Sequence, residues 1–414
     1  MPGRGSIRHR GDTWEYLIEV GMRLRQRCLS CGRPFWVERR PLETCPRCGG
    51  ELHEQDERFR VSDGGYRTRK ACQAAMAKAL TAIEQHTFVL PDDATVREFI
   101  LQEWLPAIRG TLRPTTYASY TSLCERHVIP RLGAVQLQKL SPSQLNGLYA
   151  QLLEEGRVRG GGGLSNSSVR RVHAVIHRFC HDAVRWGRLT VNPAAAADPP
   201  KASAEHDELT VWNAEQLAAF LASTESDRLF GLWRLLAMTG MRRGEALGLR
   251  WDDLDMEAGQ LSIRRALVPV NSVAQISEPK TKRGRRTIAL DPETLEALKA
   301  HAARQADEQA LWEGSWSDLG YVFTREDGRL LAPQVVSKTF RALARRAALP
   351  RIRLHDLRHT YATLALAAGV NPRVVSARLG HATVAFTLDI YSHVLPQADR
   401  DAAERIADLL RPAA

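Results

Sequence analysis

The sequence contains no long apolar run. No stretch approaches the roughly 18 consecutive apolar residues that a membrane-spanning helix needs, so such a helix is excluded. The first residues, Met1–Ser6, lack the apolar core of a secretory signal, and we therefore expect a cytoplasmic protein without membrane partners. Cysteine is also scarce, with 7 residues in 414. In a reducing compartment these cysteines indicate metal ligation or burial rather than disulfides.

Negative charge is the scarcer sign. The chain has 58 Lys and Arg residues against 47 Asp and Glu residues, a formal net charge of +11 and a pI near 9.6. Residues 1–90 have 16 basic against 11 acidic side chains, whereas residues 201–414 have 29 against 27. A basic surface favours polyanions. We therefore expect the N-terminal half to follow a DNA backbone and the C-terminal half to carry chemistry.

The length exceeds that of one typical domain, and the pattern of elements predicts three domains. Residues 1–90 are expected to form a small α+β domain and residues 91–190 a helical domain. A linker is expected at 191–208, followed by a mixed α/β domain at 209–414 that ends in a tail helix. The predicted fold class is therefore multidomain and mainly α, with small β-sheets.

The first 90 residues predict strands followed by a helix. β-Branched and aromatic side chains favour a strand over Trp14–Val20. Gly64-Gly65 predicts a turn, and the alanine-rich stretch Ala71–Gln85 predicts a helix. We expect an insertion at about residues 21–62 between the strands.

The insertion contains two Cys-x-x-Cys pairs. Cys28 and Cys31 are followed, after thirteen residues, by Cys45 and Cys48. Such pairs let four thiolates meet one tetrahedral ion, and a glycine follows each second cysteine, where the chain must turn sharply. The pattern predicts one structural Zn²⁺ in a zinc-ribbon-like module. Four thiolates leave no open coordination position, which argues against a catalytic role for this ion.

Residues 91–190 show apolar positions at helical spacing. Ser141-Pro142 is a helix start, an N-cap residue followed by proline at the first helical position. Asn192-Pro193, four alanines and a further Pro-Pro pair predict the linker. The expected helices are Thr95–Trp104, Arg113–His127, Ser141–Leu153 and Ser165–Trp186.

Residues 209–414 mix helices with short strands. Asn213 and Gln216 form a capping-box signature, and Asp291-Pro292 opens a further helix. Other helices are expected at Arg228–Thr239, Gln334–Ala348, His355–Ala368 and Arg373–Leu379, and strands near Leu261–Val268 and Arg286–Leu290.

Six residues of this last region stand in an order that suits phosphoryl transfer. They are Arg242, Lys280, His355, Arg358, His381 and Tyr391. A phosphodiester under attack gathers negative charge on its non-bridging oxygens, and two arginines can clamp those oxygens through paired hydrogen bonds. A tyrosine hydroxyl can attack phosphorus and hold the DNA end covalently.

The motifs around these residues resemble the active site of the tyrosine recombinases, the family of phage integrases and Xer-type resolvases. They read Thr239-Gly-Met-Arg-Arg-Gly-Glu245, Pro279-Lys-Thr281, His355-Asp-Leu-Arg-His359, Leu379-Gly-His381 and Thr387-Leu-Asp-Ile-Tyr391. The resemblance covers about residues 92–395. It implies that the helical domain is a core-binding (SAM-like) domain and that the mixed domain is the catalytic domain.

The resemblance implies a role for each phosphate-binding residue. Arg242 and Arg358 would bind the scissile phosphate, and His381 would make a hydrogen bond to it. From its spacing, Glu245 is placed to hold Arg242 or Arg243. Arg283, Arg285 and Arg286, which follow Lys280 in the sequence, would bind phosphates adjacent to the scissile one.

The resemblance also implies how protons move. Tyr391 would be the nucleophile, and His355 would help to manage its proton. A lysine would protonate the departing 5′ hydroxyl. Lys282 competes with Lys280 for this role, and Lys280 is preferred because it stands in Pro-Lys-Thr, as in many relatives. The chemistry would need neither a metal ion nor ATP.

The implied function is that of an integrase of a prophage or integrative mobile element, which cuts and rejoins DNA through a 3′-phosphotyrosyl intermediate. Its partners would be double-stranded attachment sites, three further copies of the chain in a homotetramer, and a directionality factor or host DNA-bending protein. The expected location is cytoplasmic and nucleoid-associated. Alternatives are an Xer-like resolvase, a conjugative-element transposase and a catalytically silent DNA-binding regulator.

The front of the chain also resembles a known module. Residues 5–14 and 64–70 are similar to the small three-stranded arm-binding domain at the start of many phage integrases. That resemblance implies a sheet that lies on arm-type DNA. The sequence leaves open whether the zinc module touches DNA or protein.

Overall fold

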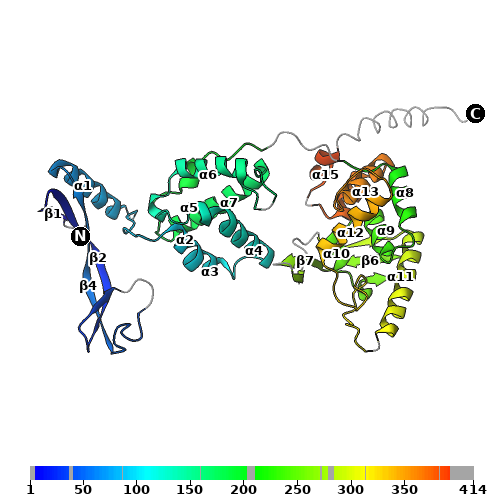
Figure 1. Ribbon diagram of the computed structural model, residues 1–414, viewed down its shortest axis with the longest axis horizontal. Helices are drawn as coiled ribbons and strands as arrows, with labels where there is room; N and C mark the ends of the chain where they lie inside the picture. The colour runs from blue at the N-terminus through cyan, green and yellow to red at the C-terminus, as the bar shows by residue number, and fades with distance from the viewer. Residues whose placement is uncertain are drawn as a thin grey trace, which may run out of the picture. The chain divides into compact units, whose positions relative to one another are not determined.

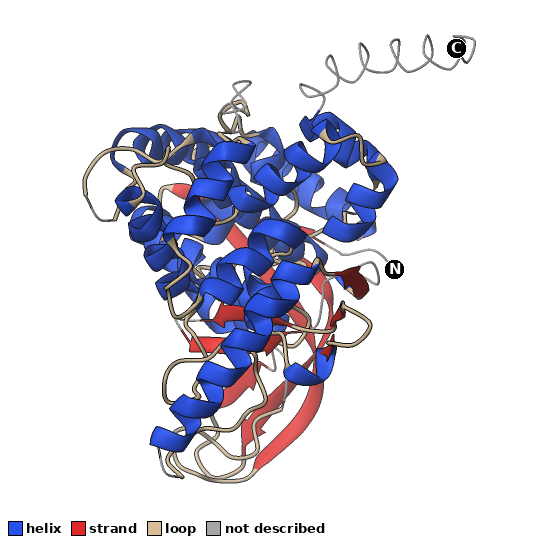
Figure 2. Cartoon of the chain, turned by 90° about the vertical axis from the view of Figure 1, so that its right-hand side faces the viewer, coloured by secondary structure: helices blue, strands red, loops and turns tan. Residues whose placement is uncertain are grey.

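A computed structural model describes most of the chain (Figure 1). The described residues are 5–36, 41–85, 87–158, 160–202, 210–270, 273–277, 284–312, 314–381 and 383–391. The chain divides into two compact units, one of residues 1–112 with 119–202 and one of residues 113–118 with 203–414. Helices predominate over small sheets (Figure 2), as predicted. No described helix is both long and apolar enough to span a membrane.

The N-terminal sheet is antiparallel and has one helix against it. Strand β2 pairs with all three other strands. Tyr16 and Ile18 alternate along β2 and are buried with Val61, Cys72 and Ala79 between sheet and helix. The elements are β1 Gly5–Arg10, β2 Thr13–Cys28, β3 Pro34–Trp36, β4 Leu52–Tyr66 and α1 Arg69–Glu84.

The predicted insertion prolongs the sheet and does not interrupt it. Beyond the predicted strand end at Val20, β2 and β4 stay paired from Gly21 opposite Phe59 to Cys28 opposite Leu52. Two exposed strands can continue in this way because each backbone group finds its partner across the ladder, even though the side chains are mostly polar.

The turn predicted at Gly64-Gly65 is wrong, because both glycines lie inside β4. The register slips there, with Trp14 opposite Tyr66 but Tyr16 opposite Asp63. This is a β-bulge, and Gly65 adopts a φ of +90° that other residues rarely reach. The glycine pair is therefore used to kink a strand and not to end it.

The described elements between α1 and residue 202 are helical, and all four predicted helices are present. The first two are longer than predicted and each contains a π-helical turn. Pro106 and Pro130 follow these turns; proline has no N–H for the regular ladder, and a wider turn accommodates the gap. The segments are α2 Val96–Glu98, η1 Phe99–Trp104, α3 Leu105–Ile108, α4 Pro114–Leu123, η2 Cys124–Val128, α5 Ile129–Leu132, η3 Leu137–Lys139, α6 Pro142–Glu155, α7 Asn166–Arg185 and η4 Pro193–Ala196.

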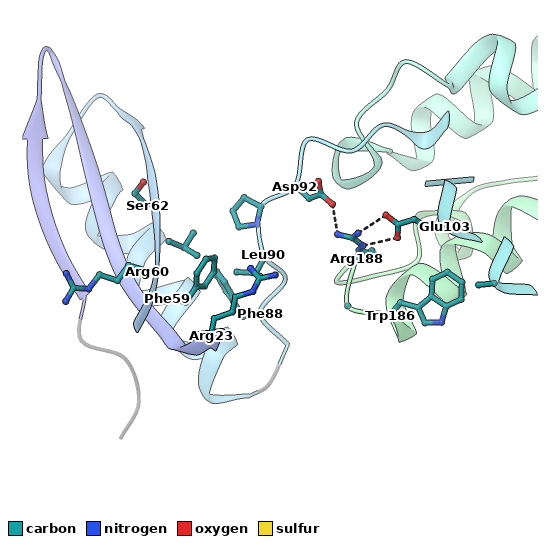
Figure 3. A pocket seen from close by; sticks show the side chains of 14 residues that line it. Arg23, Phe59, Arg60, Ser62, Phe88, Leu90, Asp92, Glu103, Trp186 and Arg188 are labelled. Carbon is teal, nitrogen blue, oxygen red and sulfur yellow. Dashed lines mark hydrogen bonds and ion pairs between the residues drawn. The ribbon is translucent and has the colours of Figure 1, made fainter. Parts of the chain in front are cut away.

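Arg188 holds the segment before α2, which contains Asp92, against the helices of this unit. Its guanidinium pairs with Asp92 at 2.7 Å and with Glu103 at 2.7 Å (Figure 3). A cavity of about 910 Å³ lies beside these residues. Phe88 and Leu90 of the same segment pack against the core of the N-terminal sheet. Charge on one side and apolar packing on the other thus anchor this connection.

The first part of the predicted linker is packed structure. Pro193 and Ala194 are buried in the 3₁₀ helix η4, which contacts α7. Asn192 accepts a hydrogen bond from the Ala194 N–H and so caps this turn. The unit extends to Ala202, and residues 203–208 of the predicted linker lie outside the described residues.

The second unit surrounds an apolar core with helices and two small sheets. Strands β5, β6 and β9 form one antiparallel sheet, and β7 and β8 form a hairpin. The rings of Trp212, Phe220, Trp233 and Phe340 pack together, with centroids 5.1 to 6.2 Å apart. The strands are β5 Leu254–Asp255, β6 Gln260–Ile263, β7 Ala266–Val270, β8 Val273–Ser277 and β9 Arg286–Ala289.

The predicted helices of this unit start within two residues of their predicted positions. Asn213 and Gln216 form the expected capping box, and Asp291 caps the helix that begins at Pro292. The predicted strand Leu261–Val268 is in fact two strands, because Arg264 and Arg265 lie between β6 and β7 and pair with the buried Asp253. The helices are α8 Ala214–Ser223, α9 Phe230–Thr239, α10 Arg243–Leu247, η5 Trp251–Asp253, α11 Pro292–Leu311, α12 Pro333–Arg346, α13 Asp356–Ala367, α14 Pro372–Leu379 and α15 Val384–Tyr391.

Candidate active site

Arg242 is placed by a sharp change of chain direction. Helix α9 ends at Gly240, whose φ is +61°. A Cβ at this position would come within 2.6 Å of Leu379 and of Tyr361, so only glycine lets the three helices α9, α13 and α14 meet here. Arg242 follows as the N-cap residue of α10. The glycine therefore sets where the arginine enters the site.

Glu245 holds the Arg242 side chain. The Oε1 atom of Glu245 lies 2.8 Å from Nη1 of Arg242, and its Oε2 atom accepts from the Arg242 backbone N–H at 2.9 Å. Of the two partners proposed for Glu245 from the sequence, Arg242 is therefore the one it binds. Arg243 instead donates to Ser337. A second Arg242 nitrogen, Nη2, donates to the main-chain oxygen of Gly380 at 3.3 Å.

Arg286 had been expected to bind a phosphate at the surface, but its side chain lies inside the protein. Its side chain is 8% exposed and pairs with Glu245 at 2.9 Å. Its Nε also donates to the main-chain oxygen of Arg378. The buried carboxylate of Glu245 thus needs two arginines, one inside the protein and one in the site. Sequence spacing gave no sign of this pair, because the two residues are 41 positions apart.

Glu245→Gln should destabilise the protein strongly. Burial pushes the pKa of the Glu245 carboxyl up, but hydrogen bonds and charge from Arg286 and Arg242 outweigh it and hold the pKa below 4.5. The variant would leave Arg286 buried without its counterion, at a cost of about 3 kcal/mol in the free energy of unfolding. Chemical denaturation at pH 7 measures this loss.

The loss should depend on pH. Because the folded-state pKa of Glu245 is depressed, its stabilisation is full well above pH 4.5 and fades as the pH falls through the folded-state value. Glu293→Gln serves as the control, since Glu293 is 74% exposed and pairs with Arg234 alone among the described residues, and it should cost no more than about 1 kcal/mol. Equal effects of the two variants would contradict the assignment.

His355 and Arg358 lie one helical turn apart at the start of α13. His355 is the N-cap residue and exposed, whereas Arg358 is buried. Nη1 of Arg358 donates to the main-chain oxygen of Gly240 at 2.9 Å. The Arg358 guanidinium is thus tied to the same glycine that precedes Arg242. The rings of His355 and His359 stand edge to face with centroids 5.3 Å apart.

His381 follows the left-handed Gly380 that ends α14. Its side chain is buried, and Nδ1 lies 2.7 Å from the hydroxyl of Thr387 on α15. Burial, followed by the nearby charges of Arg358 and Arg242, lowers the pKa of His381 to about 4. His381 is therefore neutral near pH 7, and a neutral imidazole donates one hydrogen bond and accepts another.

The same influences act on His355. His355 keeps an exposed surface, yet the protein around it removes part of its hydration; this comes first, and the charges of His359, Arg358 and Arg242 add to it, so that the pKa of His355 is lowered. Neutral His355 is able to accept a proton. The structure therefore brings together four of the six predicted residues: two charged arginines, and two histidines whose pKa values are lowered in part by the charges of those arginines.

Two of these four residues, Arg242 and His355, line a cationic pocket of about 450 Å³. No carboxylate is among the described residues that line it. Sequence reasoning missed Arg341 and Arg353, because arginines on a helix face or a loop have no distinctive spacing. The lining consists of Arg242, Arg243, Gly244, Ser337, Arg341, Arg353, Leu354 and His355.

Two predicted site residues are not fully described. Lys280 and its competitor Lys282 lie outside the described residues. Tyr391 is the last residue of α15, and its side chain is not described. Its role as nucleophile and the role of a lysine as proton donor therefore stay predictions.

The four predicted metal ligands lie together. The sulfur atoms of Cys28, Cys31, Cys45 and Cys48 all lie within 4.8 Å of one another. The Cys28 and Cys48 sulfurs are 3.5 Å apart, and those of Cys31 and Cys45 are 3.7 Å apart. Tetrahedral zinc with bonds of about 2.3 Å separates its sulfur ligands by about 3.8 Å. The donor set thus fits this ion.

The backbone of this module supports the same reading. The glycines that follow each second cysteine, Gly32 and Gly49, both have φ +69°. A hydrogen bond from the Cys31 backbone N–H leads the effects that lower the pKa of Cys28, while the pKa of the neighbouring Cys48 is raised. A thiolate is the form that binds metal.

Comparisons with known proteins agree with this geometry. A family model described as "Phage integrase family" matches residues 208–398, and one described as "Phage integrase, N-terminal SAM-like domain" matches residues 95–153. A "Tyrosine recombinase XerC-like" protein of Caldanaerobacter subterraneus is 28% identical over 83% of this chain and 90% of its own length. The "ICEBs1 integrase" of Bacillus subtilis is 24% identical over 72% of this chain and 79% of its own length.

Solved structures share the fold. The Tn1549 transposon integrase in complex with circular intermediate DNA superposes with a TM-score of 0.60 at 20% identity, covering 76% of this chain and 99% of that one. A lambda integrase dimer bound to a core site gives a TM-score of 0.53 at 16% identity, covering 72% and 95%. The predicted multidomain fold class and the family resemblance are thus confirmed. The chain belongs to the phage integrase family of tyrosine recombinases, enzymes that cleave and rejoin DNA.

Proposed function

We propose that this chain is the integrase of a prophage or integrative mobile element and joins attachment sites in double-stranded DNA. The observation that carries the proposal is the pairing of Arg242 and Arg358. Arg242 donates to the main-chain oxygen of Gly380, which precedes His381, and Arg358 donates to that of Gly240, two residues before Arg242. Two permanently charged forks fixed in this way suit the non-bridging oxygens of one phosphate.

The proposed chemistry exchanges one phosphodiester bond for another. The Tyr391 oxygen attacks phosphorus while the bond to the 5′ oxygen breaks, leaving a 3′-phosphotyrosyl link. Neutral His355 takes up the tyrosine proton, and Lys280 gives a proton to the departing 5′ oxygen. Arg242, Arg358 and a hydrogen bond from His381 stabilise the charge that develops on the phosphate. Reversal with a new 5′ hydroxyl rejoins the strand without an external energy source.

The proposed working form is a homotetramer that exchanges strands between two duplexes in pairs. Residues 91–190 would grip the core site together with the catalytic domain, and residues 1–90 would bind arm-type DNA. The DNA complexes of the Tn1549 transposon and lambda integrases support DNA as the substrate. A directionality factor or host DNA-bending protein would complete the assembly on longer sites.

An Xer-like resolvase is the second candidate. The similarity to the XerC-like protein of Caldanaerobacter subterraneus favours it. The relatives described as integrases, such as those of Bacillus subtilis and of Mycobacterium phage L5, favour the first. A silent regulator would have no need for the neutral histidines and interlocked arginines that this site keeps.

Covalent trapping tests the proposal. The protein is incubated with a duplex that spans the joined ends of its element and carries a nick beside the cleavage position, so that the short leaving strand diffuses away. A denaturing gel should then show a protein–DNA adduct that protease removes. An element-end duplex that is bound but never linked would contradict the proposal, and adducts only on the host's chromosome-dimer site would favour the resolvase.

We also propose that Cys28, Cys31, Cys45 and Cys48 bind one structural Zn²⁺. The module at the end of the long β2–β4 ladder is too short to bury a core of its own, and a metal would supply the missing stability. Zinc would hold the loops at 28–31 and 45–48 together, and the closed thiolate set gives it no part in DNA cleavage.

Cys45→Ser should release the zinc and loosen the module without stopping cleavage of a minimal core site. Elemental analysis should find about one equivalent in the unaltered protein and little in the variant, and proteolysis should cut the variant within residues 21–62. Cys72→Ser is the matched control, since Cys72 is buried in the adjacent core and outside the cluster. Less than about half an equivalent in protein purified without chelator would refute the metal site.

A further inference from the structure

Two arginines of the cationic pocket are held by one serine. Nη1 of Arg243 donates to the Ser337 hydroxyl at 2.6 Å. Nε of Arg341, one turn further along α12, donates to the Ser337 main-chain oxygen at 3.3 Å. Both guanidiniums line the pocket that also contains Arg242 and His355. The serine thus joins α10 to α12 and fixes two further positive charges beside the proposed scissile phosphate.

The charges of these two arginines are not balanced. Arg242 is paired with Glu245 and Arg353 with Asp356. In the part of the chain that the structure describes, neither Arg243 nor Arg341 forms an ion pair. Burial works against the charged form of Arg243 and lowers its pKa, yet arginine stays charged in proteins. The partly desolvated guanidinium of Arg243, beside the exposed one of Arg341 in a pocket lined by no carboxylate among the described residues, calls for an anion from outside the chain.

We propose that Arg243 and Arg341, positioned by Ser337, bind the phosphate next to the scissile one on the cleaved DNA strand. The inference rests on the proposed function, because it takes the scissile phosphate to lie at Arg242 and Arg358. Consecutive phosphates are one nucleotide apart, so a strand held at Arg242 brings its neighbour to the other side of the same pocket. The planar guanidinium fork suits a phosphate. Arg243 and Arg341 are then binding residues and Ser337 a positioning residue.

The test combines charge removal on both partners. Single-turnover formation of the covalent complex is measured on nicked duplexes that carry either normal phosphates or one neutral methylphosphonate beside the scissile position. Arg243→Gln and Arg341→Gln should each slow the reaction on normal DNA roughly 10- to 100-fold, as expected when a charge-assisted hydrogen bond is lost. On the methylphosphonate duplex that lacks the contacted charge, the reaction of the unaltered protein should slow by a similar factor. The reaction of each variant should be little slower on this duplex than on normal DNA.

Two further variants keep the test decisive. Ser337→Ala should also slow cleavage of normal DNA, and its loss too should shrink on the methylphosphonate duplex, which a merely structural effect would not do. Arg346→Gln, an exposed arginine of the same helix outside the pocket, should react like the unaltered protein on every duplex. Because Arg341 is exposed, its variant reports on binding even if Arg243→Gln folds poorly.

The outcomes separate this inference from the proposed function. Equal losses for the arginine variants on normal DNA and on each methylphosphonate duplex would overturn the second phosphate contact, while covalent complex formed by the unaltered protein would leave the integrase function standing. Failure of the unaltered protein to form any complex on normal DNA would instead overturn the function on which the inference rests.

Discussion

Tyr391→Phe is expected to abolish the covalent protein–DNA complex while DNA affinity stays near that of the unaltered protein. The substitution removes one hydroxyl, the atom that would attack phosphorus, and keeps the ring. Tyr391 stands at the end of α15, the helix whose Thr387 hydroxyl lies 2.7 Å from His381. The helix that carries Tyr391 is thus joined to the site at His381. Denaturing gels measure the complex, and mobility shift measures affinity.

Tyr321→Phe supplies the matched control, because it removes a hydroxyl from the same unit at a ring that lies under Arg250. It should form the complex at the normal rate. Peptide mapping of the adduct on the unaltered protein should locate the DNA on the peptide that contains Tyr391. A covalent complex formed by Tyr391→Phe would show that another residue is the nucleophile.

Arg242→Lys is expected to slow formation of the complex by at least about 100-fold, although the charge is kept. Lysine offers a point charge in place of a planar fork, so it cannot satisfy Glu245, the Gly380 oxygen and a phosphate oxygen together. The Arg242 side chain is 43% exposed, and the retained charge still neutralises Glu245. The free energy of unfolding should therefore change little, by about 1 kcal/mol.

Single-turnover kinetics on the nicked duplex give the rate, and thermal unfolding shows whether the fold is intact. Arg304→Lys is the control, since Arg304 also donates through Nη1 to main-chain oxygens, those of Asp227 and Arg228, but does not line the pocket. It should react normally. If Arg242→Lys cleaves within a few-fold of the unaltered protein, the bidentate contact is not what makes this arginine necessary.

Local chemistry accounts for the elements that sequence reasoning placed well. Ser141, Asn213 and Asp291 each cap the helix predicted for them, because a cap depends only on residues within one turn. The alternating side chains in the core-facing part of β2 predict a strand. The polar residues that continue β2 to Cys28 show no such pattern, so the sequence does not predict that part. Gly64-Gly65 shows the limit, since two glycines permit a bulge as readily as a turn and the partner strand decides between them.

The sequence alone determined two features of the protein: the order of reactive residue types from Arg242 to Tyr391, and the spacing of the four cysteines. Both can be recognised without a structure because few side-chain types can bind a phosphate, attack phosphorus or ligate a metal ion. Only the tertiary structure decided which charges are available. Arg286 and Arg243 look alike in sequence, yet Arg286 is buried as the counterion of Glu245 whereas Arg243 opens onto the pocket. Burial and pairing arise from segments distant in the chain, and they determine whether an arginine stabilises the protein or binds DNA.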